Sequence, residues 1–374
     1  MNKNPTILCL FGTRPEVIKM GPVLRALEEL GNSKRVLVSS EQQADLLPAF
    51  ISELGIAVAD RLDAMQKGQS INQLLSELIK SLETSYERHA PDAVLVQGDT
   101  TTALAGALSA FHQKIPVMHI ESGLRTDNKY SPFPEEVNRR LITQLSSLHF
   151  APTERNYKAL IQEGVADRNI VLSGNPIVDA VQMVIDSGGA SDRCKTLVSR
   201  ASGHRIVVVT MHRRENFGAR LCGYFAAIKE FATRKNVFVV LPLHPNPEPR
   251  AAAQEIFSDS ENVHLVEPFN YPDFIYLLSH AWLALSDSGG IQEEVSTLGI
   301  PLLVLREVTE RPEILENGTA KLIVTPDALR NELNQIENNP AWLEEVKNKA
   351  NPFGNGESGA LIARAILDFL SRTE

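Results

Sequence analysis

The chain has 374 residues, of which 43% are hydrophobic and 22% charged, and its formal net charge is −9. These proportions are typical of a soluble globular protein, and the length suits two domains better than one. The negative charge argues against a nucleic-acid-binding surface, although local basic sites are still allowed.

The N-terminal residues Met1 to Pro5 lead directly into an apolar segment, which is not the pattern of a signal peptide. No apolar run is long enough to span a bilayer, so we expect a cytoplasmic protein without a membrane partner. Three widely spaced cysteines, Cys9, Cys194 and Cys222, form no CxxC pair, and we expect neither a disulfide nor a metal role for them.

Short apolar runs alternate with longer segments of helical period, which is typical of parallel βα units. The strands predicted in the first half are Thr6–Phe11, Arg35–Ser39, Ala93–Val96, Pro116–Ile120, Leu148–Ala151 and Ile170–Leu172. Those predicted in the second half are Arg205–Thr210, Val237–Leu241, Val263–Val266, Trp282–Ser286, Pro301–Leu305 and Lys321–Val324. The clearest helical segments are Glu16–Leu30, Ser70–Arg88, Thr101–His112, Asp327–Ile336 and Ser358–Ser371.

The strand series restarts near residue 205, after the polar tract Ser187–His204. We therefore predict an α/β fold with two doubly wound, Rossmann-like domains and a boundary near Asn175 and Pro176. A G-x-G-x-x-G match from Gly354 to Gly359 follows no predicted strand, so it lacks the context of a dinucleotide-binding fingerprint. It is better interpreted as a turn that caps the last helix.

Polar residues follow the predicted strands, where a doubly wound sheet binds its ligands. After the first strand, Arg14 and Lys19 place positive charge near the start of a helix. A cation there opposes the helix dipole, so a phosphate ligand explains it better than helix stability does. A solvated basic turn is the alternative.

Three carboxylates occur at neighbouring strand ends of the first half. Asp99 follows the third strand, Glu121 follows the fourth, and Glu135 begins a helical segment after Pro134. Each one, taken singly, could be a helix cap. Glu121 has no basic residue beside it in the sequence, so we expect burial to raise its pKa. Together they suggest general acid/base groups.

The second half supplies cations and a glycine turn. The segment from Asp287 to Glu294 is predicted to form a turn between a strand and a helix, with Asp287 and Ser288 as N-cap residues. The adjacent Gly289 and Gly290 allow backbone N–H groups to approach an anion. No lysine is present, which excludes a Walker-type loop. The two glutamates of this helix would repel phosphate, so we expect them to bind sugar hydroxyls unless they are simply solvated.

Other cationic side chains follow strands of the second half in the same way. His212 lies beside two arginines at a strand end, His244 follows the next strand, and Arg311 lies near a helix start. Phe274 could stack on a flat base, although core packing is the more frequent fate of such a residue. No zinc template or GxSxG elbow is present. The residues alone therefore predict a metal-free site for a nucleotide diphosphate whose attached group undergoes proton transfer or displacement.

Several of these segments together resemble the non-hydrolysing UDP-N-acetylglucosamine 2-epimerases, in that family's order and over nearly the whole chain. The matching segments are Gly12–Glu16, Gly98–Thr102, His119–Arg125, Pro132–Arg139, His212–Glu215, Asp287–Glu294 and Glu310–Glu313. The resemblance implies a GT-B-like fold, with two Rossmann-like domains facing across a cleft. Residues 1–175 would form the first domain, residues 176–355 the UDP-binding domain, and residues 356–374 a helix that returns to the first domain.

The resemblance also implies a reaction, the reversible conversion of UDP-GlcNAc to UDP-ManNAc through a 2-acetamidoglucal, for cell-surface polysaccharide precursors. It implies no cofactor and no metal, and it implies a homodimer. The catalytic residues it assigns are Asp99, Glu121, Glu135 and His212. The substrate ligands it assigns are Arg14, Lys19, Arg139, His244, Phe274, Ser288, Gly289, Gly290, Glu294 and Arg311. Phe274 ends the segment from Val266 in which the family binds uracil.

One departure from the family pattern concerns regulation. This chain reads Glu41-Gln42-Gln43 where many bacterial members have Gln-His-Arg, a segment of their activating UDP-GlcNAc site. We therefore expect that substrate is not needed as an activator, although the segment from His244 to Pro247 partly keeps another activator motif. Two alternatives to the epimerase remain open from sequence. One is a hydrolysing epimerase that releases ManNAc and UDP, and the other is a GT-B glycosyltransferase that uses a UDP-sugar.

Overall fold

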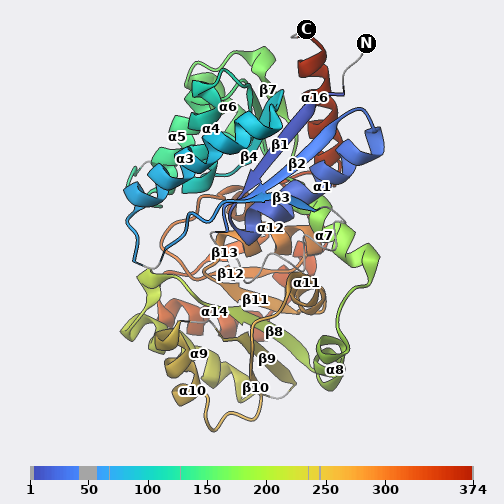
Figure 1. The fold of residues 1–374 in the computed structure, drawn as a ribbon. Coiled ribbons are helices and arrows are strands. Elements are labelled where there is room, and N and C mark those ends of the chain that lie inside the picture. Colours follow the sequence, from blue (N-terminus) through green and yellow to red (C-terminus); the bar gives the residue numbers. More distant parts are fainter. Residues whose placement is uncertain are drawn as a thin grey trace. The chain divides into compact units, whose positions relative to one another are not determined.

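The computed structural model describes residues 4–41, 57–66, 68–126, 128–234, 236–243 and 246–372. The chain divides into two compact units, each built on a parallel sheet (Figure 1). Unit 1 comprises residues 1–180 and 353–374, and unit 2 comprises residues 181–352. The predicted α/β class is therefore confirmed.

Unit 1 contains a seven-stranded sheet of order β3-β2-β1-β4-β5-β6-β7. Its strands are β1 (Thr6–Phe11), β2 (Lys34–Ser39), β3 (Val58–Arg61), β4 (Ala93–Gln97), β5 (Val117–Ile120), β6 (Leu148–Ala151) and β7 (Ile170–Leu172). Its helices are α1 (Arg14–Leu30), α3 (Ile71–His89), α4 (Thr101–His112), α5 (Glu135–Leu145), α6 (Glu154–Gln162) and α16 (Ser358–Arg372), with α7 (Pro176–Ser187) leading into unit 2. The edge strand β3 was not predicted, because its alternating polar residues form no apolar run.

Unit 2 contains a six-stranded sheet of order β10-β9-β8-β11-β12-β13. Its strands are β8 (Arg205–Thr210), β9 (Val237–Pro242), β10 (Val263–Val266), β11 (Leu283–Ser286), β12 (Leu302–Val304) and β13 (Ala320–Leu322). Its helices are α8 (Asp192–Arg200), α9 (Ala219–Ala232), α10 (Pro247–Ile256), α11 (Tyr271–Ser279), α12 (Gly289–Leu298), α13 (Glu313–Glu316), α14 (Pro326–Asn338) and α15 (Ala341–Val346).

Close packing in unit 1 fixes the helices that carry site residues. A Cβ on Gly106 of α4 would collide with the side chain of Leu10 in β1, so the glycine lets α4 lie directly on the sheet. The buried Tyr86 of α3 donates a hydrogen bond to the Gly106 carbonyl at 3.1 Å. The N-terminus of α4 is thereby held beside the ends of β1 and β4.

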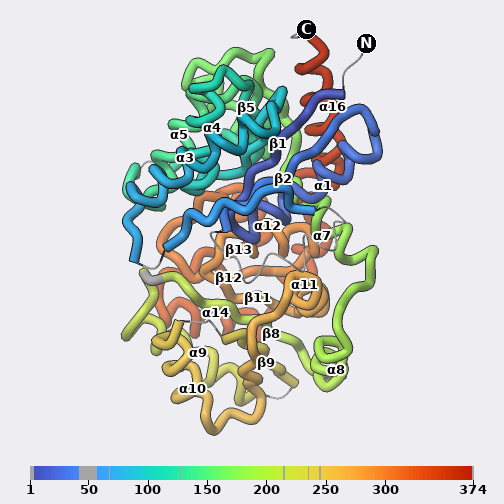
Figure 2. The backbone as a smooth tube through the Cα atoms, in the orientation of Figure 1, coloured from blue at the N-terminus to red at the C-terminus, as the bar shows by residue number. Residues whose placement is uncertain are grey.

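The last helix belongs to unit 1, as the tube in Figure 2 shows, where α16 lies beside α1. The backbones approach closely, since a Cβ on Gly359 would lie 2.7 Å from the carbonyl oxygen of Pro22. Asp179 accepts a hydrogen bond from the Gly359 N–H at 2.9 Å and so caps this helix. The glycine-rich segment before α16 forms turns and no strand, in agreement with the rejection of a dinucleotide fingerprint.

Candidate active site

Strand order reverses between β1 and β4 in unit 1, and between β8 and β11 in unit 2. Ligands of doubly wound sheets bind outside the carboxyl ends of strands at such switch points. The segments predicted to bind ligand follow these strands, with Gly12–Glu16 after β1, Gly98–Asp99 after β4 and Asp287–Gly290 after β11. Each unit therefore brings its own candidate residues together.

Glu16 ties together the two loops at the switch point of unit 1. Its buried carboxylate accepts hydrogen bonds from the N–H groups of Gly12 and Thr13, at 2.9 and 2.7 Å, and from Thr100 Oγ1 at 2.7 Å. Burial raises the pKa of Glu16, although these hydrogen bonds oppose the shift. Glu16 was not predicted as a site residue, but the capping-box spacing of Thr13 and Glu16 could have revealed it.

Glu121 stands just after β5 with a φ of 64°, in the left-handed region that non-glycine residues rarely adopt. Lys19 Nζ lies 2.8 Å from Glu121 Oε2, and Gln97 donates a hydrogen bond to the same oxygen. Glu121 has no basic residue beside it in the sequence, but Lys19 reaches it from α1, far away along the chain. Lys19 was predicted to bind phosphate, and in this structure it also holds the Glu121 carboxylate.

Asp99 does not cap α4, because the N-cap residue is Thr100. The Thr100 hydroxyl accepts a hydrogen bond from the N–H group of Ala103. Arg139 holds Asp99 instead, with Nε and Nη2 at 3.0 and 2.6 Å from Oδ2. Arg139 Nη1 reaches Glu136 at 3.2 Å. Glu135 is half-buried at the start of α5, whereas its neighbour Glu136 is fully buried.

Two buried histidines lie on the neighbouring strands β5 and β6. His119 Nε2 is 2.8 Å from the Gly98 carbonyl oxygen, which requires the ring to carry its proton on Nε2. Burial lowers the pKa of His119 to about 3. His149 pairs with His119 in register across β5 and β6, and burial lowers its pKa to about 4. Both rings are therefore neutral at pH 7.

Asp287 organises the switch point of unit 2. Its buried carboxylate accepts hydrogen bonds from the N–H groups of His212 and Arg213, both at 3.0 Å, and from Asn216 Nδ2 at 2.9 Å. It also lies 3.2 Å from His212 Nδ1. Burial works to raise the pKa of Asp287, but the His212 contact and the other hydrogen bonds outweigh it, and the pKa is lowered. The prediction that Asp287 caps α12 was wrong, since Ser288 is the N-cap residue.

Arginines gather at the N-terminus of α12. A Cβ on Gly289 would lie 2.8 Å from Arg311 Nη1 and 3.7 Å from Arg213 Nη2, whereas one on Gly290 would meet nothing within 4 Å. Arg311 Nε donates to Glu293 Oε1 at 2.6 Å. Two cations at a positive helix end form a site suited to a multiply charged anion. The prediction that Glu293 binds sugar hydroxyls is corrected, because its buried carboxylate holds Arg311.

The remaining predicted ligands have positions that neither support nor contradict their roles, so these roles stay predictions. Glu294 is buried on α12, Phe274 is half-buried on α11, and Arg14 is half-buried at the start of α1. His244 lies outside the described residues, as do Gln42 and Gln43 of the departing activator segment.

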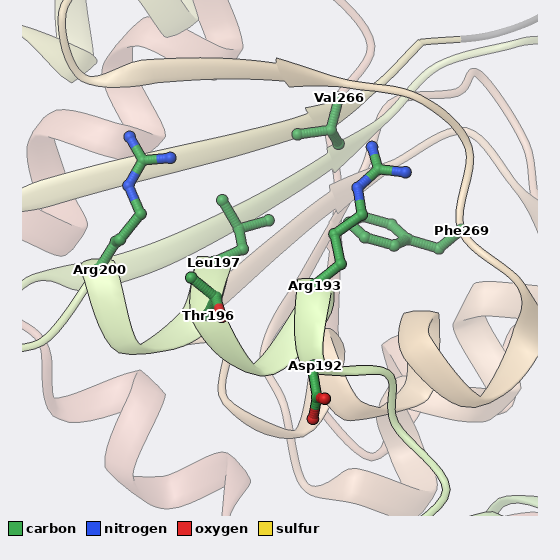
Figure 3. Close-up of a pocket in the computed structure, with 7 residues that line it drawn as sticks. All are labelled: Asp192, Arg193, Thr196, Leu197, Arg200, Val266 and Phe269. Carbon is green, nitrogen blue, oxygen red and sulfur yellow. The ribbon is translucent and has the colours of Figure 1, made fainter.

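A separate cavity of about 410 Å³ lies in unit 2 between α8 and the end of β10 (Figure 3). Its lining residues are Asp192, Arg193, Thr196, Leu197, Arg200, Val266 and Phe269. The predicted ligands of the pyrophosphate are absent from this lining. The cavity is therefore distinct from the arginine site at α12, and it touches the predicted uracil segment through Val266 and Phe269.

Within the described part of the chain, no group of three or more His, Cys, Asp or Glu side chains could hold a metal ion. Among the helices described there, none is long and apolar enough to cross a membrane.

Two parallel sheets with candidate residues at their switch points place the protein in the GT-B-like class of α/β proteins. A family model described as UDP-N-acetylglucosamine 2-epimerase matches residues 25–367, and the chain belongs to this family.

Similar proteins agree with this membership. The UDP-N-acetylglucosamine 2-epimerase of Neisseria meningitidis serogroup A is 39% identical over 367 residues, which cover 96% of this chain and 99% of that protein. The solved Neisseria meningitidis UDP-GlcNAc 2-epimerase, bound to UDP-GlcNAc, matches with a TM-score of 0.91 over 97% of this chain and 100% of that one. The Methanocaldococcus jannaschii enzyme in complex with UDP-GlcNAc and UDP is 32% identical, with a TM-score of 0.83 over 97% of this chain and 99% of that one.

Proposed function

We propose that the chain interconverts UDP-N-acetylglucosamine and UDP-N-acetylmannosamine by inverting C2 of the sugar. The observation that carries the proposal is the strained Glu121, whose carboxylate is held by Lys19 and Gln97 at a ligand-binding strand end. Strain of this kind persists where function requires a fixed geometry. The family, and its solved members with UDP-GlcNAc, support the choice of substrate.

C2–H is not adjacent to a carbonyl, so direct deprotonation is difficult. In the proposed sequence, a carboxylate takes the C2 proton while the bond between C1 and the UDP oxygen breaks. The C–H electron pair forms the C1–C2 double bond of a 2-acetamidoglucal, and UDP leaves with the electron pair of the C1–O bond. Protonation of the other face of C2 and re-addition of UDP to C1 complete the inversion.

The two units supply different parts of this chemistry. Unit 1 contributes the acid/base groups Asp99, Glu121 and Glu135, together with the predicted ligands Arg14, Lys19 and Arg139. Unit 2 stabilises the pyrophosphate as it leaves, through His212, Ser288, Gly289, Gly290 and Arg311. Glu294 binds the ribose, Phe274 contacts the uracil, and His244 is a further predicted ligand. No cofactor takes part.

The cellular setting belongs to the same proposal. The protein acts in the cytoplasm as a homodimer, and its product feeds cell-surface polysaccharide precursors. Neither a membrane nor a nucleic acid is required for the reaction.

The test is incubation with UDP-GlcNAc in D₂O, followed by NMR of the anomeric signals and of C2 deuteration. The expected result is UDP-ManNAc, with deuterium at C2 of both nucleotide sugars. Free ManNAc and UDP would indicate the hydrolysing reaction instead. A requirement for an acceptor, without deuterium at C2, would indicate a glycosyltransferase.

A further inference from the structure

Glu136 is a carboxylate that the sequence did not single out, and it is fully buried in α5. It accepts hydrogen bonds from the Thr126 N–H at 3.0 Å, from Arg140 Nε at 2.7 Å and from Arg139 Nη1 at 3.2 Å. Donors from three different residues hold this buried carboxylate, so Glu136 is a rigid anchor for Arg139.

Arg139 connects this anchor to Asp99. Its Nε and Nη2 both contact Asp99 Oδ2, while its Nη1 stays on Glu136. The guanidinium is planar and rigid, so its orientation at one carboxylate sets its orientation at the other. The side chain of Asp99 is 26% exposed and that of Arg139 is 5% exposed. Of these two side chains, that of Asp99 is therefore the one that a ligand can reach.

Helix α5 also holds the backbone of Asp99, because Asn138 Nδ2 donates to its carbonyl oxygen at 2.9 Å. Oδ1 of Asp99 accepts no hydrogen bond from the residues that the structure describes. Arg139 of α5 therefore holds Oδ2 of Asp99, whereas Oδ1 can still accept a proton from a ligand.

Stability alone is a poor explanation for this arrangement. Removing two charged groups from water costs free energy that their attraction often does not recover, so a buried ion pair is weak evidence for stabilisation. Fixing the direction of a reacting carboxylate is a better explanation, because small displacements of a catalytic group have large effects on rate.

We propose that Glu136 is a positioning residue, which acts through Arg139 to aim Asp99 at the sugar C2. The inference rests on the proposed function, since it assigns Asp99 to the acid/base chemistry. It also gives Arg139 a role different from the direct contact with substrate that the sequence predicted.

The test compares Glu136→Gln, Arg139→Lys and the double variant with wild type, by kcat, KM, C2 deuteration in D₂O and calorimetric UDP affinity. Lysine keeps the positive charge but cannot contact two carboxylates in a fixed geometry. We expect each single variant to lose roughly 100-fold in kcat and in C2 exchange, because the base is misdirected. KM and UDP affinity should stay close to wild type.

The double variant separates positioning from general structural damage. If Glu136 acts through Arg139, the double variant is no slower than Arg139→Lys, since the two losses share one cause. Independent, multiplying losses would overturn the proposal. Glu163→Gln is the matched control, because Glu163 pairs with Arg140 and Arg125 without contacting Asp99 or Arg139, and it should keep wild-type kcat.

The remaining outcomes are also decisive. Wild-type kcat in Glu136→Gln contradicts the positioning role, and a parallel loss of UDP affinity in Arg139→Lys makes Arg139 a substrate ligand instead. If Glu136→Gln does not fold, wild-type kcat in Arg139→Lys still overturns the inference. A wild-type enzyme without C2 exchange refutes the proposed function itself, and the positioning role of Glu136 with it.

Discussion

The two units share a parallel sheet and a switch point, but the ion pairs of their candidate site residues are arranged in opposite ways. In unit 1 the buried Arg139 holds Asp99, and the buried Lys19 holds Glu121. In unit 2 the buried Glu293 holds Arg311, and the buried Asp287 holds the loop of His212.

Exposure shows which partner of three of these pairs is nearer to solvent. Asp99 is more exposed than Arg139 in unit 1, whereas Arg311 and His212 are more exposed than their carboxylates in unit 2. The outward group is thus anionic in the pair of Arg139 and Asp99 and cationic in the pair of Arg311 and Glu293. A carboxylate that accepts a proton is anionic, whereas a side chain that binds a pyrophosphate is cationic. The contrast therefore predicts that variants in unit 1 will slow proton transfer and that variants in unit 2 will weaken anion binding.

The largest expected effect is on chemistry in unit 1. Asp99→Asn removes a proposed acid/base group, and we expect kcat to fall about 10²- to 10⁴-fold while UDP affinity is kept. NMR rates and calorimetry measure the two quantities. Asp92→Asn is the control, since Asp92 accepts a hydrogen bond from the Thr6 N–H at the amino end of β1, the end opposite to the site. A wild-type rate in Asp99→Asn would remove the distinction between the units.

In unit 2 the largest effect is on stability. Asp287→Asn places an amide among donors that need a carboxylate, and we expect the local free energy of unfolding to fall by about 3 kcal/mol. Hydrogen exchange of β8 and β11 peptides measures it. Asp327→Asn is the exposed control and should leave exchange in these strands unchanged. Unchanged protection in Asp287→Asn would show that the carboxylate does not organise this unit.

The buried histidine of unit 1 predicts a difference in acid sensitivity. The pKa of His119 is about 3 in the folded protein against an ordinary 6.5, so the unfolded chain binds more protons between these values. This contribution to stability is present above pH 6.5 and is lost as the pH falls toward 3. In unit 2, the corresponding loss for Glu310 occurs at lower pH, because its pKa falls from an ordinary 4.5 to about 2.

His119→Gln tests this difference, since its amide can still donate to Gly98 but does not titrate. We expect the dependence of unit 1 stability on pH between 6.5 and 4 to weaken by about 1.4 kcal/mol per pH unit relative to wild type. Hydrogen exchange in β4 and β5 across this range measures the slope. An unchanged slope in His119→Gln would contradict a neutral buried ring.

The smallest expected effect concerns the arginine site. Gly289→Ala would place a Cβ 2.8 Å from Arg311 Nη1, so the guanidinium must move away from the helix end. We expect UDP affinity to fall about tenfold, the equivalent of one weakened charge-assisted hydrogen bond. Calorimetry measures the affinity. At Gly290 the added methyl group meets open space, so a comparable loss there would mean that the ligand itself fills that space.

Apolar periodicity was enough to predict most of the fold. Several strands, such as Leu148–Ala151, have the predicted bounds, because a buried parallel strand is an uninterrupted apolar run. The edge strand β3 has no such run and was missed. Strand ends also predicted where polar residues gather, since the carboxyl ends of parallel strands share one edge of a sheet.

Pairings between distant residues could not be predicted in the same way. Lys19 reaches Glu121 across 102 positions, a contact that depends on how α1 packs against the sheet. Glu135 and Glu136 are identical in type and adjacent in sequence, and only helix phase separates the half-buried one from the buried one. The sequence therefore gives residue types at the site, whereas packing decides which partner each one holds.

The position of α16 has a consequence for the order of events during synthesis. The chain leaves unit 1 after Ala180 and re-enters it at Phe353, so residues of unit 1 are made both before and after all of unit 2. Domains generally fold as units while the ribosome works. We therefore expect unit 2 to be complete first. Until residues 358–372 are made, the face of α1 that packs against α16 stays uncovered. A nascent chain that ends before α16 would expose that face although all seven strands of unit 1 were already made.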